Sequence, residues 1–147
     1  MPESPFDGQR PTSKPLPQCK AFLVCGEVEF DDIAGQINLY GIVSSLSFPE
    51  FPAAVPPLAL FLQMYDGIGR YRLTAELRDL AGGVGVAAEA FTDVEFPERL
   101  VKMDLALPIS SLRLPNLGRY EIAVLLDGRE LATQFIDVEA TNDDETR

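Results

Sequence analysis

Hydrophobic and polar residues alternate along most of the chain with a period of two, not with the roughly 3.6-residue period of an amphipathic helix. The clearest example runs from Arg70 to Asp79. Its apolar positions are Tyr71, Leu73, Ala75 and Leu77, and polar or charged residues lie between them. One apolar and one polar face are typical of an antiparallel strand that is buried on one side only.

Glycine, proline and acidic residues separate further segments of this kind. The expected strands cover residues 20–30, 36–48, 58–65, 70–79, 84–96, 100–107, 118–126 and 130–138. Asp127-Gly128, between the last two, is a strong signal for a tight β-hairpin. Residues 110–117 leave room for one short helical turn. The pattern predicts an all-β fold, a two-sheet antiparallel sandwich of about seven to eight strands.

A tyrosine near the start of the penultimate strand indicates the topology. Gly118-Arg119-Tyr120 opens that strand, and a tyrosine there can bond its hydroxyl to upstream backbone, as in immunoglobulin-like sandwiches. Gly69-Arg70-Tyr71 opens another strand in the same way, which we interpret as recurrent chemistry at strand starts. An immunoglobulin-like topology is preferred, although the chain has no tryptophan and lacks the immunoglobulin cysteine pair.

The length of 147 residues suits a single domain. Residues 1–17 are rich in proline and are expected to form a flexible N-terminal arm. The sandwich domain is assigned to residues 18–139, and residues 140–147 to an acidic C-terminal tail.

The charge balance argues against several classes of partner. Twelve basic residues face 23 acidic ones, for a net charge of -11. Nucleic-acid binding depends on clustered Lys and Arg, and anionic membranes repel acidic proteins, so neither is expected as a partner. The chain shows no membrane-spanning apolar run and no signal-peptide pattern, which predicts a cytoplasmic location. Cys19 and Cys25 are expected to be reduced, because six residues of one strand separate them too widely for a disulfide.

The absence of histidine removes the commonest general base and metal ligand. We therefore expect no catalytic residues, no metal site and no cofactor. One catalytic alternative remains, a hydrolase based on carboxylates, because Glu27, Glu29 and Asp31 alternate along one strand face. An ordinary solvated strand face explains the same pattern.

Three segments are apolar at five consecutive positions: 21–25, 58–62 and 122–126. If they share one sheet, its outer face carries an apolar patch, to which we assign Leu23, Phe61 and Leu125. Such a patch usually marks an interaction site, and we predict a symmetric homodimer through it or binding of another protein. Alternatively, the N-terminal arm covers the patch, or the residues are ordinary surface scatter.

The proline-rich crossing around residues 48–57 is a second candidate surface. Phe48 and Phe51 could form a recognition loop there. The alternative is that both rings close one end of the core.

Three segments resemble an uncharacterised bacterial family of small β-sandwich proteins. They are residues 21–28 with the Asp31-Asp32 turn, the strand at residues 40–42 leading to Phe51-Pro52, and the hairpin opened by Gly118 and Tyr120. The resemblance implies an immunoglobulin-like fold and a bacterial source, but no activity.

These observations favour a non-enzymatic protein-interaction or assembly module. The first alternative is a structural subunit of a larger particle of phage or secretion-system type, in which the proline-rich arm reaches a neighbour. The carboxylate-based hydrolase is the second.

Overall fold

The computed structural model describes residues 14–80 and 86–141, and every regular element within them is a strand. The all-β prediction is therefore confirmed. The strands are β1 (Gln18–Asp31), β2 (Gln36–Ile42), β3 (Ser45–Phe48), β4 (Ala53–Ala54), β5 (Leu58–Tyr65), β6 (Gly69–Asp79), β7 (Val86–Phe96), β8 (Met103–Ile109), β9 (Arg113–Leu114), β10 (Gly118–Leu126) and β11 (Arg129–Ala140).

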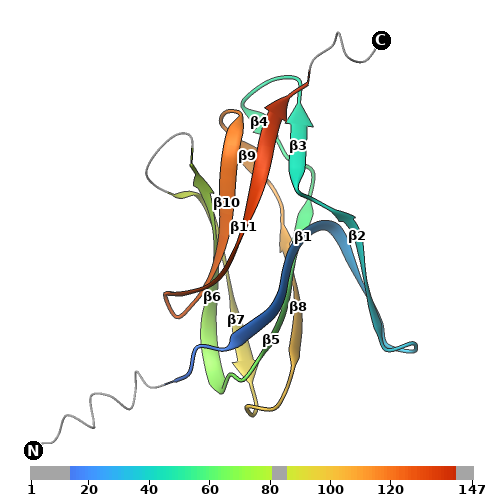
Figure 1. Ribbon diagram of the computed structural model, residues 1–147, viewed down its shortest axis with the longest axis vertical. Helices are drawn as coiled ribbons and strands as arrows, with labels where there is room; N and C mark the ends of the chain where they lie inside the picture. Colours follow the sequence, from blue (N-terminus) through green and yellow to red (C-terminus); the bar gives the residue numbers. More distant parts are fainter. Residues whose placement is uncertain (1–13, 81–85, 142–147) are drawn as a thin grey trace, which may run out of the picture.

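The strands form two larger sheets and one small pair (Figure 1). The four-stranded sheet has the order β2-β1-β5-β8, and the five-stranded sheet has the order β3-β11-β10-β6-β7. β4 pairs with β9. All pairings are antiparallel except that between β3 and β11, which is parallel.

One apolar core receives side chains from both larger sheets. Leu60 and Leu62 of β5 contribute from the four-stranded sheet, and Leu73 of β6 and Val124 of β10 contribute from the five-stranded sheet. Along β6 the residues predicted to face the core are buried, and the residues between them are exposed or partly exposed. Burial of these apolar side chains is the main stabilising contribution to a fold of this kind.

Two sequence-based assignments are corrected by the structure. Residues 36–48 do not form one strand, because β2 belongs to the four-stranded sheet and β3 to the five-stranded sheet. Gly41, with a φ of 66°, interrupts the extended backbone shortly before the chain crosses between sheets. Residues 110–117 contain no helical turn. Arg113–Leu114 is extended instead and pairs with Ala53–Ala54.

The two Gly-Arg-Tyr segments use their tyrosines in the same way. The Tyr120 hydroxyl donates to the backbone oxygen of Asn116 at 2.6 Å and accepts from the N–H of the same residue at 3.3 Å. The Tyr71 hydroxyl donates to the oxygen of Pro15 at 2.8 Å and accepts from the N–H of Ile68 at 3.1 Å. Both side chains are fully buried, so these bonds satisfy hydroxyls that would otherwise lack partners. The predicted return of Tyr120 onto upstream backbone is confirmed.

Residues 14–17 lie against the body of the domain. Lys14 Nζ is 2.9 Å from a carboxylate oxygen of Asp127, and Arg129 donates to the Lys14 carbonyl at 3.0 Å. Pro17 is buried. The remainder of the predicted arm, residues 1–13, and residues 142–147 of the predicted tail lie outside the described residues.

Both cysteines lie on β1 as free thiols, as predicted. Burial raises the pKa of each thiol, which disfavours the reactive thiolate. In the part of the chain that the structure describes, no helix has the length and apolarity needed to cross a bilayer.

Candidate functional site

β1 and β2 continue beyond the four-stranded sheet as a two-stranded ribbon. Cys25 of β1 pairs with Ala59 of β5 on one side and with Ile42 of β2 on the other. The residues of β1 that follow it, 27–31, pair with β2 alone. We call residues 27–42 the β1–β2 ribbon, and Figure 1 shows it extending away from the rest of the molecule. A hairpin without a third strand is only marginally stable in water, so the ribbon gains little from its own pairing.

The ribbon has one apolar face and one mixed face, because side chains alternate along each strand. The apolar face consists of Val28, Phe30, Ile37 and Leu39, which are paired across the two strands. The Phe30 side chain is 45% exposed, and Ile33 at the turn is completely exposed. Large apolar side chains therefore face solvent at the part of the ribbon farthest from the core.

The other face carries the carboxylates. Glu29 Oε1 accepts hydrogen bonds from the Tyr40 hydroxyl at 2.8 Å and from Asn38 Nδ2 at 3.1 Å. These two hydrogen bonds lower the pKa of Glu29. The hydrogen bond between Tyr40 and Glu29 also raises the pKa of Tyr40. Asp31 Oδ1 accepts from the N–H of Ala34 at 3.1 Å and so braces the turn. The carboxylates connect the two strands of the ribbon.

The carboxyl groups considered for a hydrolase, on Glu27, Glu29 and Asp31, share this face of the ribbon. Glu27 and Glu29 are exposed to solvent, and the pKa of Glu29 is lowered. A general acid at neutral pH needs a raised pKa, which comes from desolvation or a neighbouring like charge. In the described residues no group of three or more acidic or cysteine side chains could hold a metal ion.

Charge is distributed unevenly along the sequence in this region. No Lys or Arg occurs from residue 21 to residue 69, whereas the ribbon carries Glu27, Glu29, Asp31 and Asp32. The charged side chains of the ribbon itself are therefore all negative, and no basic residue nearby in the sequence offsets them.

β2 differs from the other edge strands of the two larger sheets, which are β3, β7 and β8. β7 carries three acidic residues, β8 carries an aspartate and a proline, and β3 is only four residues long. Charge, proline and shortness are the usual means by which proteins protect a sheet edge from pairing with another strand. β2 has seven residues, none of them charged and none of them proline.

The structure separates the three residues predicted to form an apolar patch. Leu23 and Phe61 are direct partners in the four-stranded sheet, but Leu125 lies on β10 in the five-stranded sheet. Phe61 is buried, with 4% of its surface exposed, on the central strand β5. These residues therefore do not share one outer face, and the prediction of a common surface patch is wrong.

Phe48 and Phe51 lie together at one end of the core. Their rings make an edge-to-face contact with centroids 6.1 Å apart, and both pack partly buried against the core cluster. This arrangement is the one expected for rings that close the end of the core.

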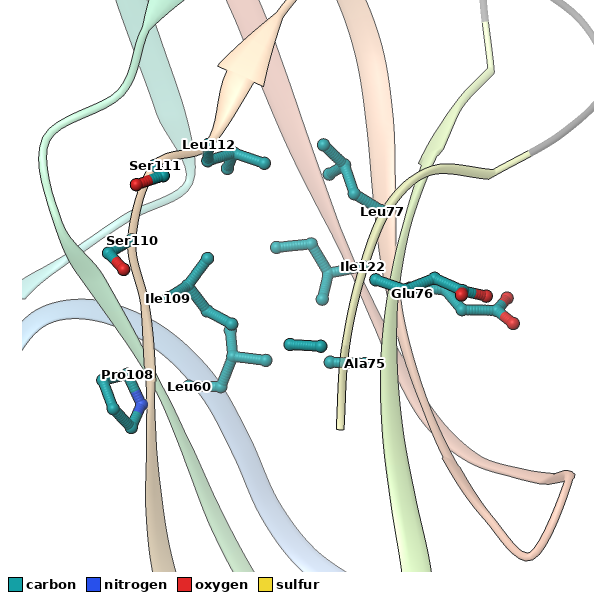
Figure 2. A pocket seen from close by; sticks show the side chains of 12 residues that line it. Leu60, Ala75, Glu76, Leu77, Pro108, Ile109, Ser110, Ser111, Leu112 and Ile122 are labelled. Atoms are coloured by element: carbon teal, nitrogen blue, oxygen red, sulfur yellow. The ribbon is translucent and has the colours of Figure 1, made fainter. Parts of the chain in front are cut away.

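A pocket of about 280 Å³ opens between the two larger sheets near residues 108–112. Figure 2 shows Leu60, Ile109 and Ile122 pointing into it, whereas Glu76 points to the opposite side of its strand. The Glu76 carboxylate pairs there with Arg78 at 3.0 Å. Ligand sites usually combine an apolar lining with a few converging polar groups. The pocket is therefore better described as an opening of the apolar core than as a polar active site.

Sequence reasoning considered the carboxylates of the ribbon but missed its free edge and exposed apolar residues. Two signals in the sequence point to them. One is the absence of basic residues from 21 to 69, and the other is the uncharged alternating segment from 36 to 42.

The chain can be compared with known families and structures. A protein-family model described as "Family of unknown function (DUF6941)" matches residues 20–139 of the sequence. Among curated proteins, none matches the sequence.

Two similar solved structures are a β-glucosidase from Listeria innocua and the same enzyme in complex with glucose. They are 11% and 9% identical to this chain, with TM-scores of 0.47 and 0.45, and each match covers 81% of this chain. The chain spans only 16% of the length of either β-glucosidase. A likeness this distant and partial does not bear on activity.

Proposed function

The chain belongs to DUF6941, a family of unknown function, and we propose that it is a non-enzymatic protein-interaction module that binds an extended segment of a partner protein at the β2 edge. In this mode the partner adds a strand next to β2, and main-chain hydrogen bonds provide the affinity. The observation that carries the proposal is the unprotected edge of β2 on the β1–β2 ribbon.

The lack of protection at β2 supports this function. An edge strand directs every second N–H and C=O group away from its neighbour, and these groups can pair with another chain. β2 is the only edge of the two larger sheets, among the described residues, without charge, proline or marked shortness.

The stability of the ribbon supports it as well. Two strands alone are marginally stable, and a third strand added at β2 would stabilise the ribbon. The same strand would cover part of the Tyr40 side chain of β2, which is 50% exposed. Removal of this apolar surface from water contributes favourably to binding.

We further propose, from the sequence, that the two larger sheets form an immunoglobulin-like sandwich. We also propose that the protein is located in the bacterial cytoplasm. The sheet orders, the parallel pairing of β3 with β11 and the Tyr120 hydrogen bond support this topology. The partner is assigned to another protein and not to a second copy.

Selection of peptides by the full chain would test the proposal. The immobilised protein is offered a library of random ten-residue peptides, and retained peptides are then added in solution during hydrogen exchange. We expect retained peptides to slow exchange of the β2 amides specifically. Retained peptides that protect other strands and leave β2 unchanged would overturn the proposal.

Two proline variants provide a matched control. N–H groups alternate in direction along a strand, so one of Asn38→Pro and Leu39→Pro removes a donor facing β1, and the other removes a donor facing the free edge. Exchange of the β1 amides identifies the variant that leaves the ribbon paired. That variant is expected to lose peptide binding, and unchanged binding by it would contradict docking at this edge.

A further inference from the structure

We infer that the strand bound at β2 alternates apolar residues with basic ones. This inference rests on the proposed function and adds the chemistry of the partner. It depends on a further observation, that the β1–β2 ribbon has an apolar face and an acidic face and that residues 21–69 contain no basic residue.

The two faces of the ribbon determine how apolar and polar residues should alternate along the partner strand. A strand paired with β2 places successive side chains on opposite faces. One set lies beside Ile37 and Leu39 on the apolar face, and the other lies beside Asn38 and Tyr40. Strict alternation of apolar and polar residues therefore suits this edge, and a continuous apolar run does not.

The charge of the polar set follows from the carboxylates. Glu27 and Glu29 lie on β1, one strand beyond β2, and face the same side as Tyr40. Neighbouring strands are about 4.8 Å apart, so a docked strand lies roughly 10 Å from the backbone of β1. Lysine and arginine side chains reach across most of this distance, and their charge complements the carboxylates.

A second copy of the chain does not have this chemistry at the same edge. β2 itself contains no basic residue, and pairing of two β2 edges would bring two acidic ribbons together. Like charges placed near one another oppose association.

Three peptides test the inference with the full-length chain. Each has nine residues with blocked ends and alternates valine with lysine, glutamine or glutamate. Calorimetry measures affinity, and hydrogen exchange locates binding. We expect the lysine peptide to bind most tightly, to protect the β2 amides and to weaken as ionic strength rises. The glutamate peptide is expected to show no measurable binding.

Matched charge variants separate local from overall attraction. Glu27→Gln/Asp32→Asn removes two charges from the ribbon but keeps the hydrogen bonds made by Glu29 and Asp31. Glu89→Gln/Asp93→Asn removes two exposed charges from the β7 edge. Each exposed pair contributes modestly, so we expect the ribbon variant to weaken the lysine peptide about three- to tenfold and the β7 variant to weaken it less than about twofold.

The outcomes distinguish this inference from the proposed function. Equal affinity of the glutamine and lysine peptides, both protecting β2, would overturn the basic partner and leave docking at the edge intact. Equal weakening by the two charge variants would also overturn it, because attraction would then come from the overall charge. Protection of β2 by a second copy, seen as a dimer in light scattering, would replace the partner with the chain itself. Failure of every peptide, including those from the random library, to protect β2 would overturn the proposed function.

Discussion

The β10–β11 hairpin and the β1–β2 ribbon have similar local elements but different surroundings. Each reverses the chain with a glycine in the left-handed region, Gly128 with a φ of 82° and Gly35 with a φ of 68°. β10 pairs with β6 and β11, and β11 also pairs with β3, so the β10–β11 hairpin lies inside the five-stranded sheet. The β1–β2 ribbon has no third strand among the described residues.

The neighbouring strands, more than the turns, decide what each hairpin contributes. Flanking strands and the facing sheet bury alternate residues of β10, and Leu126 has no exposed surface. The equivalent apolar positions of the ribbon remain partly or largely exposed, as at Leu39 and Phe30. A hairpin inside a sheet contributes buried side chains to the core, whereas a hairpin beyond the sheet keeps its apolar side chains partly or largely exposed.

The same truncation in the two hairpins should have very different effects. Leu126→Ala removes a fully buried side chain, and such changes cost about 2–5 kcal/mol of unfolding free energy. Leu39→Ala removes a partly exposed side chain of the ribbon and is expected to cost about 1 kcal/mol or less. Urea denaturation measures both values. Equal losses would show that the ribbon is part of the cooperative core, and would contradict the different contributions of the two hairpins to stability.

Substitution of the two turn glycines should separate global from local effects. An L-residue in the left-handed region costs about 1–2 kcal/mol, and neither Gly35 nor Gly128 has atoms within 4 Å of an added Cβ. Gly128→Ala should lower the global unfolding free energy by about that amount. Gly35→Ala should leave the global value unchanged and accelerate exchange of the β2 amides about tenfold, because the ribbon opens separately. A global loss in Gly35→Ala equal to that in Gly128→Ala would contradict separate opening.

Local patterns in the sequence predicted the strands well. The alternation in residues 70–79 and the Asp127-Gly128 dipeptide each reflect short-range geometry, and the structure has β6 and a tight β10–β11 turn at these places. Both Asp127 and Gly128 have positive φ, as a two-residue hairpin turn of this type requires. The Tyr120 hydrogen bond was predictable for the same reason, because its acceptor lies four residues upstream.

Sheet membership was not predictable from the same patterns. The segments around Leu23 and Leu125 have the same apolar character, yet they lie in different sheets. Strand pairing depends on contacts between residues far apart in sequence, which periodicity does not encode. The candidate site was missed for the same reason, since only the pairing shows that β2 is the outer strand of its sheet and that β1 leaves β5 after Cys25.

The smallest expected effect concerns pH, and it again contrasts the two hairpins. Burial alone would raise the pKa of Asp127, but hydrogen bonds from the Arg72 N–H and from Lys14 outweigh it and lower the pKa. A carboxyl with a lowered folded-state pKa contributes stability above its unfolded pKa of about 3.9, and this contribution is lost as pH falls through the folded pKa. Asp127→Asn should therefore reduce the loss of global stability below about pH 4, measured by urea denaturation at several pH values. Asparagine tolerates the φ of 49° at this position and can still accept from the Arg72 N–H.

Glu29→Gln is the control in the ribbon, where hydrogen bonds from Tyr40 and Asn38 lower the pKa of Glu29. We expect the two-stranded ribbon to open separately from the core, so this variant should change the acid dependence of β2 amide exchange but not that of global unfolding. A shift in the global acid transition would show that the ribbon unfolds together with the core.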